Sequence, residues 1–237
     1  MNTRIALTIA AFILTAPVLA AEEQEGPWSG KATLGYLATS GNTENSNLNS
    51  GFALGYTTGD WSHLAELHAI NATESEVTTA EAYELGWKSE WNMSEKSFLF
   101  GRLKWRKDRF SGYDTQFSQT IGYGHRLLNT DEHKLNVEAG VGARQSDLAD
   151  GTTEEEMIFR GGLQYKWHFS ETADFRQEFA VEAGSDNTYG ESITALSAKL
   201  MGNLALVASY TIKNNSDVPP LTEKTDTYTA LSLEYVF

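Results

Sequence analysis

The last thirteen residues of the chain, TDTYTALSLEYVF (225–237), alternate between two kinds of side chain. Leu231, Leu233, Tyr235 and Phe237 share one face, and smaller or polar residues dominate the other. A period of two residues predicts a β-strand with one apolar face. Because aromatic rings favour boundaries between apolar and polar surroundings, we expect this strand to end at such a boundary.

The same alternation recurs from residue 28 onwards, and no segment shows a sustained helical period. The clearest examples are residues 30–38, 47–56, 83–91, 99–106, 135–144 and 157–169. One face of these segments is apolar, while the opposite face carries many Gly and full charges. That second face suits a wet lumen better than the surface of a soluble β-sandwich, which is the alternative. The sequence therefore predicts an all-β fold, an antiparallel transmembrane β-barrel of about twelve strands in an up-and-down meander.

The connections between the predicted strands alternate in character. Those at 39–45, 72–79, 108–115, 147–155, 185–192 and 214–226 are long or polar, whereas those at 57–60, 92–96, 128–133, 170–174 and 201–203 are tighter. Aromatic residues such as Tyr56, Trp61, Trp91 and Trp167 gather beside the tighter connections. Barrels of the bacterial outer membrane have short periplasmic turns, longer outer loops and aromatic girdles. We therefore expect an outer-membrane protein with its tight turns in the periplasm.

Composition and the N-terminal residues indicate an exported protein. Residues 1–20, MNTRIALTIAAFILTAPVLA, have a basic Arg4, an apolar core at 5–14 and small residues before Ala20. This pattern predicts a cleaved signal peptide, since the core is too short for the alternative, a membrane anchor. A short periplasmic segment at 21–27 and a barrel at 28–237 are expected to follow. The formal net charge of −14 argues against nucleic acid as a partner, and the absence of Cys excludes a disulfide framework.

Several short motifs carry a family resemblance. They are SGNTE (40–44), FLFGR (98–102), DRFSGYD (108–114), GYGHRLL (122–128) and EAGVGAR (138–144). With them, residues 28–237 resemble the YdiY-like family of salt-induced outer membrane proteins. The resemblance implies an outer-membrane β-barrel with a link to salt or acid stress, and it implies no reaction and no catalytic residues. The final strand is also similar to the signal that the barrel-assembly machinery reads, so that machinery is an expected partner.

Charged residues on the polar faces of the predicted strands are the candidate functional residues. They are Glu84, Lys88, Glu90, Arg102, Lys104, Arg106, Glu138, Arg144, Arg160, Lys166, Glu178 and Glu182. A basic row at 102, 104 and 106 faces a mixed row on the preceding strand. These rows predict either a charge-selective constriction or a lumen plugged by cross-strand ion pairs. A tight hairpin at 170–174 is expected to place Lys166 opposite Glu178.

The loops offer weaker candidates. In DRFSGYD, Arg109 and Tyr113 suit a contact to lipopolysaccharide or a ligand, but Asp108 and Gly112 favour a simple turn. We interpret the acidic loop residues as a solvated surface, with divalent cations that bridge lipopolysaccharide as the alternative. These acidic residues are Glu74, Glu76, Asp147, Asp150, Glu154, Glu155 and Glu156. Their spacing matches no calcium loop, and the sequence predicts neither a metal site nor a cofactor.

The functional prediction is a narrow passive channel for small ions or solutes in the outer membrane. The first alternative is a closed-lumen barrel with a structural or surface-interaction role and no transport. A remote alternative is an outer-membrane hydrolase, which we do not expect because none of the five His forms a recognisable nucleophile motif with Ser. Outer-membrane lipid and lipopolysaccharide are the expected partners, and the oligomeric state is left open.

Overall fold

The computed structural model describes residues 26–39, 45–74, 77–109, 111–148, 151–219 and 222–237. The expected signal peptide at 1–20 and most of the segment at 21–27 lie outside these residues, as does the motif SGNTE. The strands are β1 (Trp28–Thr39), β2 (Asn45–Thr58), β3 (Trp61–Glu74), β4 (Val77–Asn92), β5 (Ser97–Asp108), β6 (Tyr113–Asn129), β7 (His133–Leu148), β8 (Thr153–Ser170), β9 (Ala173–Ala183), β10 (Thr188–Met201), β11 (Leu204–Asn215) and β12 (Thr225–Val236). No helix among the described residues is long and apolar enough to cross a membrane.

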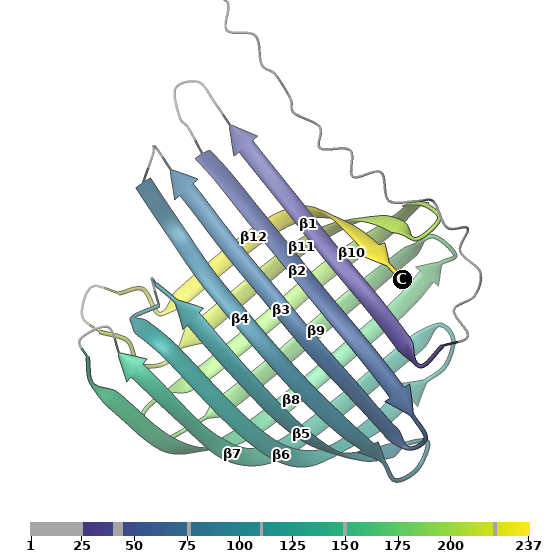
Figure 1. Ribbon diagram of the computed structural model, residues 1–237, viewed down its shortest axis with the longest axis horizontal. Helices are drawn as coiled ribbons and strands as arrows, with labels where there is room; N and C mark the ends of the chain where they lie inside the picture. The colour runs from purple at the N-terminus through teal and green to yellow at the C-terminus, as the bar shows by residue number, and fades with distance from the viewer. Residues whose placement is uncertain (1–25, 40–44, 75–76, 110, 149–150, 220–221) are drawn as a thin grey trace, which may run out of the picture.

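Every strand pairs antiparallel with its neighbours in the chain, and β12 pairs with β1 to close the sheet (Figure 1). This confirms the predicted all-β fold, a closed antiparallel barrel in which each strand follows its predecessor. We call the end that holds Trp28 and Phe237 the terminal end. The opposite end, where β1 finishes and β2 begins, is the loop end.

The barrel is polar inside and apolar outside. Among the described residues, nineteen polar or charged residues are buried against only eight hydrophobic ones. Large apolar side chains instead face outwards, as Leu34, Ile121 and Phe159 do with exposed fractions of 60% or more. This distribution inverts that of a soluble β-sandwich, whose core is apolar, and it matches a barrel wall surrounded by lipid.

The prediction of long connections at the loop end is wrong in most places. Only residues 75–76, 149–152 and 184–187 separate the strands where the sequence suggested loops of eight or nine residues. The strands continue because backbone hydrogen bonds hold the ladder after the apolar alternation has ended, as in the pairs Ser146↔Glu154 and Asp147↔Thr153. The connection from β11 to β12, residues 216–224, is the longest of those at the loop end.

Aromatic side chains gather on the outer surface at the terminal end. The ring centroids of Trp28 and Tyr56 lie 4.5 Å apart, and those of Trp61 and Trp91 lie 6.4 Å apart. On the opposite wall, the rings of Trp167 and Phe169 are 5.5 Å apart. The predicted position of the aromatic residues, beside the tight turns, is therefore confirmed.

The last residue seals the barrel at the terminal end. The backbone N–H of Phe237 donates to the carbonyl of Gly30 at 2.8 Å, and the N–H of Gly30 donates back at 2.5 Å. The ring of Phe237 lies over Gly30, where a Cβ atom would stand 2.2 Å from it. Leu231, Leu233 and Tyr235 are exposed on the same outer face. Because only Gly leaves room for the ring, this contact fixes how the final strand meets the first.

We expect Gly30→Leu to displace the Phe237 ring and to lower the free energy of unfolding by about 1–3 kcal/mol. The midpoint of urea unfolding, measured on the barrel refolded into lipid vesicles, checks this. Gly101→Leu is the matched control, because a Cβ atom at Gly101 meets nothing within 4 Å. Equal shifts in the two variants would mean that the ring contact does not stabilise the closure.

Candidate functional site

The structure places all twelve predicted charged residues on inward-facing positions of their strands, where they line the lumen or contribute to its ion pairs. Most are almost inaccessible, and Arg144 is completely buried. Arg102, Lys166 and Glu178 differ, because they border open space inside the barrel and belong to none of the tight clusters. The other nine charges fall into three groups, each held by a different set of strands.

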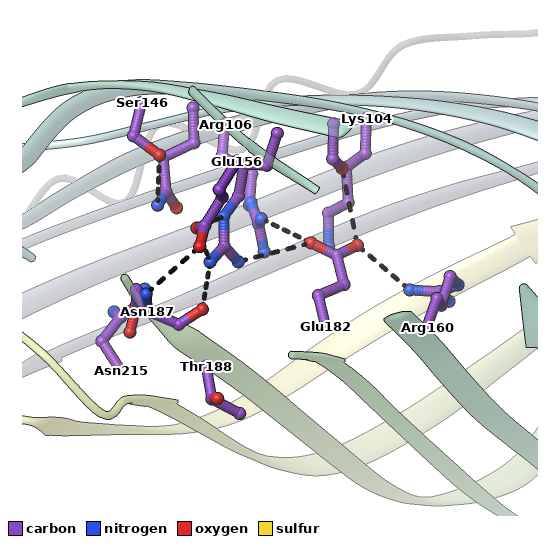
Figure 2. A network of polar contacts seen from close by, with 12 residues as sticks. Lys104, Arg106, Ser146, Glu156, Arg160, Glu182, Asn187, Thr188 and Asn215 are labelled. Atoms are coloured by element: carbon purple, nitrogen blue, oxygen red, sulfur yellow. Dashed lines mark hydrogen bonds and ion pairs between the residues drawn. The ribbon is translucent and has the colours of Figure 1, made fainter. Parts of the chain in front are cut away.

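The first group, the Glu182 cluster, consists of Glu182, Arg106, Arg144 and Arg160. Glu182 on β9 is 1% exposed and accepts hydrogen bonds from Arg106 Nη2 at 3.0 Å and Arg160 Nη1 at 3.2 Å. Arg144 Nη1 lies 3.8 Å from the same carboxylate. Figure 2 shows Glu182 between Arg106 and Arg160, with side chains that come from different strands meeting in the lumen. One carboxylate therefore neutralises parts of three guanidinium groups at the centre of the barrel.

The second group, the Lys104 cluster, crosses the lumen. Lys104 Nζ lies 2.9 Å from Glu84 on the neighbouring strand β4 and 2.9 Å from Glu191 on β10. Lys213 on β11 forms a further ion pair with Glu84. These contacts join strands that are distant in the sheet, so they tie opposite walls of the barrel together.

The third group, the Lys88 cluster, lies nearer the terminal end. Lys88 Nζ forms ion pairs with Glu90, at 2.7 Å, and with Glu138. The same ammonium lies 5.4 Å and 5.5 Å from the ring centroids of Phe98 and Phe100, which are buried inside the barrel. Glycines on β6 leave space for these rings. Aromatic rings and paired charges together fill the part of the lumen bounded by β4 to β7.

Polar groups also cap the loop end on the side of β6 to β12. Asn187 is 2% exposed, and its side chain donates to Asn215 Oδ1 at 2.8 Å and accepts from the backbone N–H of Asp217 at 3.2 Å. Its backbone carbonyl accepts from Arg144, and Glu156 accepts from Arg144 Nε at 3.0 Å. The cap is thus built directly on the Glu182 cluster.

Asn187→Ala should open this cap, because it leaves the buried Asn215 side chain without its donor. We expect the free energy of local opening of the cap to fall by about 1–3 kcal/mol. The measurement that checks this is the rate of proteolysis within residues 216–224, which should rise. Asn203→Ala is the control, since Asn203 is exposed and lies in the turn between β10 and β11 at the terminal end, away from residues 216–224. Unchanged proteolysis of Asn187→Ala would show that Asn187 does not hold the loop.

The DRFSGYD segment forms a turn of this cap, as Asp108 and Gly112 suggested. Gly112 has a φ of 85°, which favours glycine, and a Cβ atom there would stand 2.4 Å from Pro219 Cδ. Tyr113 is 4% exposed and donates to the carbonyl of Asp217 at 3.0 Å. Tyr113 is therefore not available for a contact to lipopolysaccharide, which corrects that alternative. Arg109 is largely exposed and lies 3.2 Å from Glu81.

Two further expectations are corrected by the structure. Lys166 stands opposite Arg176, and Glu178 stands opposite Gln164, because only two residues separate β8 and β9 and the register shifts once more between His168 and Ser170. Glu156 is not a solvated loop residue but a buried partner of Arg144. Among the other acidic residues, Asp147 accepts hydrogen bonds from two Thr hydroxyl groups, while Glu76 and Asp150 lie outside the described residues.

The outer surface carries a Ser–His contact, and the sequence motifs did not reveal this contact. His63 Nδ1 lies 2.8 Å from Ser89 Oγ, on neighbouring strands. The other described contacts of His63 are stacked or tilted aromatic rings of Tyr56, Trp61 and Trp87. A nucleophilic Ser requires a third group that orients the His, and these rings do not supply one. The pair fits the aromatic girdle rather than a catalytic site.

The lumen remains open along the side formed by β1 to β4 and β9 to β12. A central cavity of about 210 Å³ adjoins a vestibule of about 570 Å³ at the terminal end. Five side chains line both spaces and mark their junction: Lys31, Glu66, Arg102, Arg176 and Glu178. Towards the loop end the central cavity meets a space of only about 20 Å³, which also borders Glu84 and Lys213. The space beneath the cap therefore holds about one water molecule.

More basic than acidic side chains line the vestibule, although the whole chain is acidic. Six basic side chains line it, against three carboxylates, and Glu138 and Glu234 just outside this lining pair with Lys88 and with Lys31 and Arg176, which leaves a smaller surplus of positive charge. The basic residues are Lys31, Lys88, Arg102, Lys134, Lys166 and Arg176, and the acidic ones are Glu66, Glu90 and Glu178. A charged wall of one sign raises the local concentration of ions of the opposite sign. The vestibule is consequently suited to small anions.

Comparisons with known proteins agree with this architecture. The solved COG4313 outer membrane channel from Pseudomonas putida F1 superposes with a TM-score of 0.56 at 8% identity, covering 94% of this chain and 99% of that one. The NanC porin gives a TM-score of 0.50 at 9% identity, covering 87% of this chain and 97% of the porin. At these identities the likeness shows the fold alone.

Sequence comparison is more specific. The uncharacterized protein YdiY of Escherichia coli (strain K12) is 32% identical over 213 residues, which cover 88% of this chain and 83% of YdiY. A family model described as a protein of unknown function, DUF481, matches residues 32–237. Both findings confirm the resemblance carried by the short motifs, and the chain belongs to the DUF481 family.

Proposed function

We propose that this protein is an outer-membrane barrel that acts as a narrow passive channel for small ions or solutes, with a preference for anions. The observation that carries the proposal is that the vestibule and the central cavity adjoin inside the barrel and share the side chains at their junction, Arg102 and Glu178 among them. Charged walls on both sides of this space supply polar contacts for a hydrated ion. Structural neighbours described as an outer membrane channel and a porin support the same reading.

The proposed orientation puts the terminal end in the periplasm and the cap outside the cell. The N-terminal signal-peptide pattern, the aromatic girdle beside the tight turns and the final aromatic residue support this placement. In this orientation the positive vestibule faces the periplasm. The link to salt or acid stress, lipopolysaccharide as an outer partner and delivery by the barrel-assembly machinery remain part of the proposal.

The reversal potential in a potassium chloride gradient tests the ion preference. We expect the refolded protein in a planar bilayer to give a reversal potential whose sign reports selectivity for chloride over potassium, because the vestibule has a surplus of positive charge. A reversal potential that reports potassium selectivity would contradict the role of the vestibule.

A closed-lumen barrel is the second candidate, and one observation favours it. The Glu182 cluster, the Lys88 cluster and the cap fill much of the lumen beside β5 to β8, and the space beneath the cap is about 20 Å³. A folded barrel without current would support this second role, in which the protein stabilises the envelope or presents its outer loops.

A further inference from the structure

The closing seam between β1 and β12 is paired over only part of its length. Five residue pairs join these strands, from Lys31↔Val236 to Gly35↔Ser232. The neighbouring pairs of strands are far more complete, with twelve residue pairs between β1 and β2 and eleven between β11 and β12. Figure 1 shows β1 and β12 meeting near the C-terminus and diverging towards the loop end of β1.

The diverging part of β12 has a free backbone edge. Residues 225–231 pair with β11 on one side, whereas within the described residues the pairing with β1 stops at Ser232. Seven residues of strand correspond to about 23 Å of edge. Unpaired N–H and C=O groups are costly where lipid tails replace water, and a free edge readily accepts a partner. The seam therefore needs water or another polar group beside it.

A cavity with a partly apolar wall lies directly behind the seam. Thr33 of β1 and Ser232 of β12 line the central cavity together with Ile193, Ala195 and Val207. Neutral and apolar side chains on this wall contrast with the ion pairs of the opposite wall. Ser232 is 4% exposed, and its hydroxyl has no hydrogen-bond partner among the described residues. The wall behind the seam thus offers apolar surface and one unused polar group.

The floor of the same cavity is charged. Glu234 lies 3.1 Å from Arg176 Nη2 and 3.6 Å from Lys31 Nζ, so one carboxylate is shared by two cations. On the outside, the seam is flanked by the exposed apolar side chains of Tyr36 and Leu231. The seam thus has apolar surface on its outer side and on part of the cavity wall, with polar groups at its edge, which matches a molecule that combines an apolar tail with a polar group.

We propose that the unpaired part of the seam is a lateral portal through which the apolar tail of a membrane amphiphile, such as an acyl chain, enters the central cavity from the bilayer. The tail would lie against Ile193, Ala195 and Val207, and the polar part would meet the seam edge and Ser232. This inference concerns a path through the barrel wall and holds whether or not the lumen conducts ions along its axis.

Fluorescence quenching by lipids with brominated acyl chains tests the portal. The chain has no Cys, so a single Cys can be labelled with bimane in the otherwise unchanged protein, refolded into vesicles of brominated phosphatidylcholine. The test position is Ser209→Cys, which lines the cavity. Its neighbour Tyr210→Cys faces outwards, and Asn136→Cys lines the vestibule away from the seam. Each variant is first shown to fold by its gel mobility with and without boiling.

We expect the brominated lipid to quench the Ser209 label at least half as strongly as the Tyr210 label, and to leave the Asn136 label unchanged. Adding Ala230→Leu, a bulkier residue on the inward face of the unpaired edge, should remove the quenching at Ser209. Quenching of Ser209 no stronger than that of Asn136 would overturn the proposal, and so would quenching by aqueous iodide alone. Chloride current measured on the same variants separates this result from the proposed channel function.

Discussion

Glu182→Gln should destabilise the barrel by about 3–5 kcal/mol, because it leaves three buried guanidinium groups around a neutral amide. Arg106 Nη2 and Arg160 Nη1 lie 3.0 Å and 3.2 Å from the carboxylate that the change removes, and Arg144 is completely buried beside it. Repulsion among the three cations would no longer be offset. Since Gln has nearly the shape of Glu, the loss of stability results from the missing negative charge and not from a cavity.

The measurement is the midpoint of guanidinium chloride unfolding in lipid vesicles, read from tryptophan fluorescence. Glu81→Gln is the matched control, because its partner Arg109 is largely exposed and exposed ion pairs contribute about 0–1 kcal/mol. If Glu182→Gln shifted the unfolding midpoint no more than Glu81→Gln does, the Glu182 cluster would not stabilise the barrel.

Arg102→Ala should raise the single-channel conductance roughly two-fold and weaken the anion preference. Arg102 lines both the vestibule and the central cavity, so removing its side chain widens their junction and deletes one positive charge there. Its ion pair with Glu66 is long, at 3.9 Å, and the change therefore leaves the main clusters intact.

Lys134→Ala separates the two effects of that substitution. Lys134 lines only the vestibule, away from the junction. We expect this control to weaken the anion preference without raising the conductance. If Arg102→Ala left both quantities at the wild-type values, ions would not pass the junction, and the proposed path would be wrong.

The fold followed from the sequence because alternation records which face of each strand meets lipid. The ends of the strands did not follow, since pairing continues through polar residues such as Ser146 and Glu154, where neither face is apolar. The pairing of Lys166 was wrong for a related reason. The turn between β8 and β9 is shorter than the residues 170–174 suggested, and a register shift between His168 and Ser170 moves the pairing by one more residue, so Lys166 meets Arg176.

The candidate charges were found by their inward positions, but their partners were not. Glu191 lies within a segment interpreted as a loop and Lys213 lies next to another, yet they complete the Lys104 cluster. These contacts cross the lumen between strands that are far apart in the chain. Local pairing rules apply to neighbouring strands only, so no pattern in the sequence indicates which side chains meet across a barrel.

Single-channel conductance of the refolded protein in a planar bilayer tests the central claim most directly. The protein is first checked for the change of gel mobility on boiling that a folded barrel shows. We predict small, steady current steps with chloride preference, limited by the narrow space beneath the cap. A barrel that is folded by this criterion and passes no current in potassium chloride would contradict the claim and identify the lumen as closed.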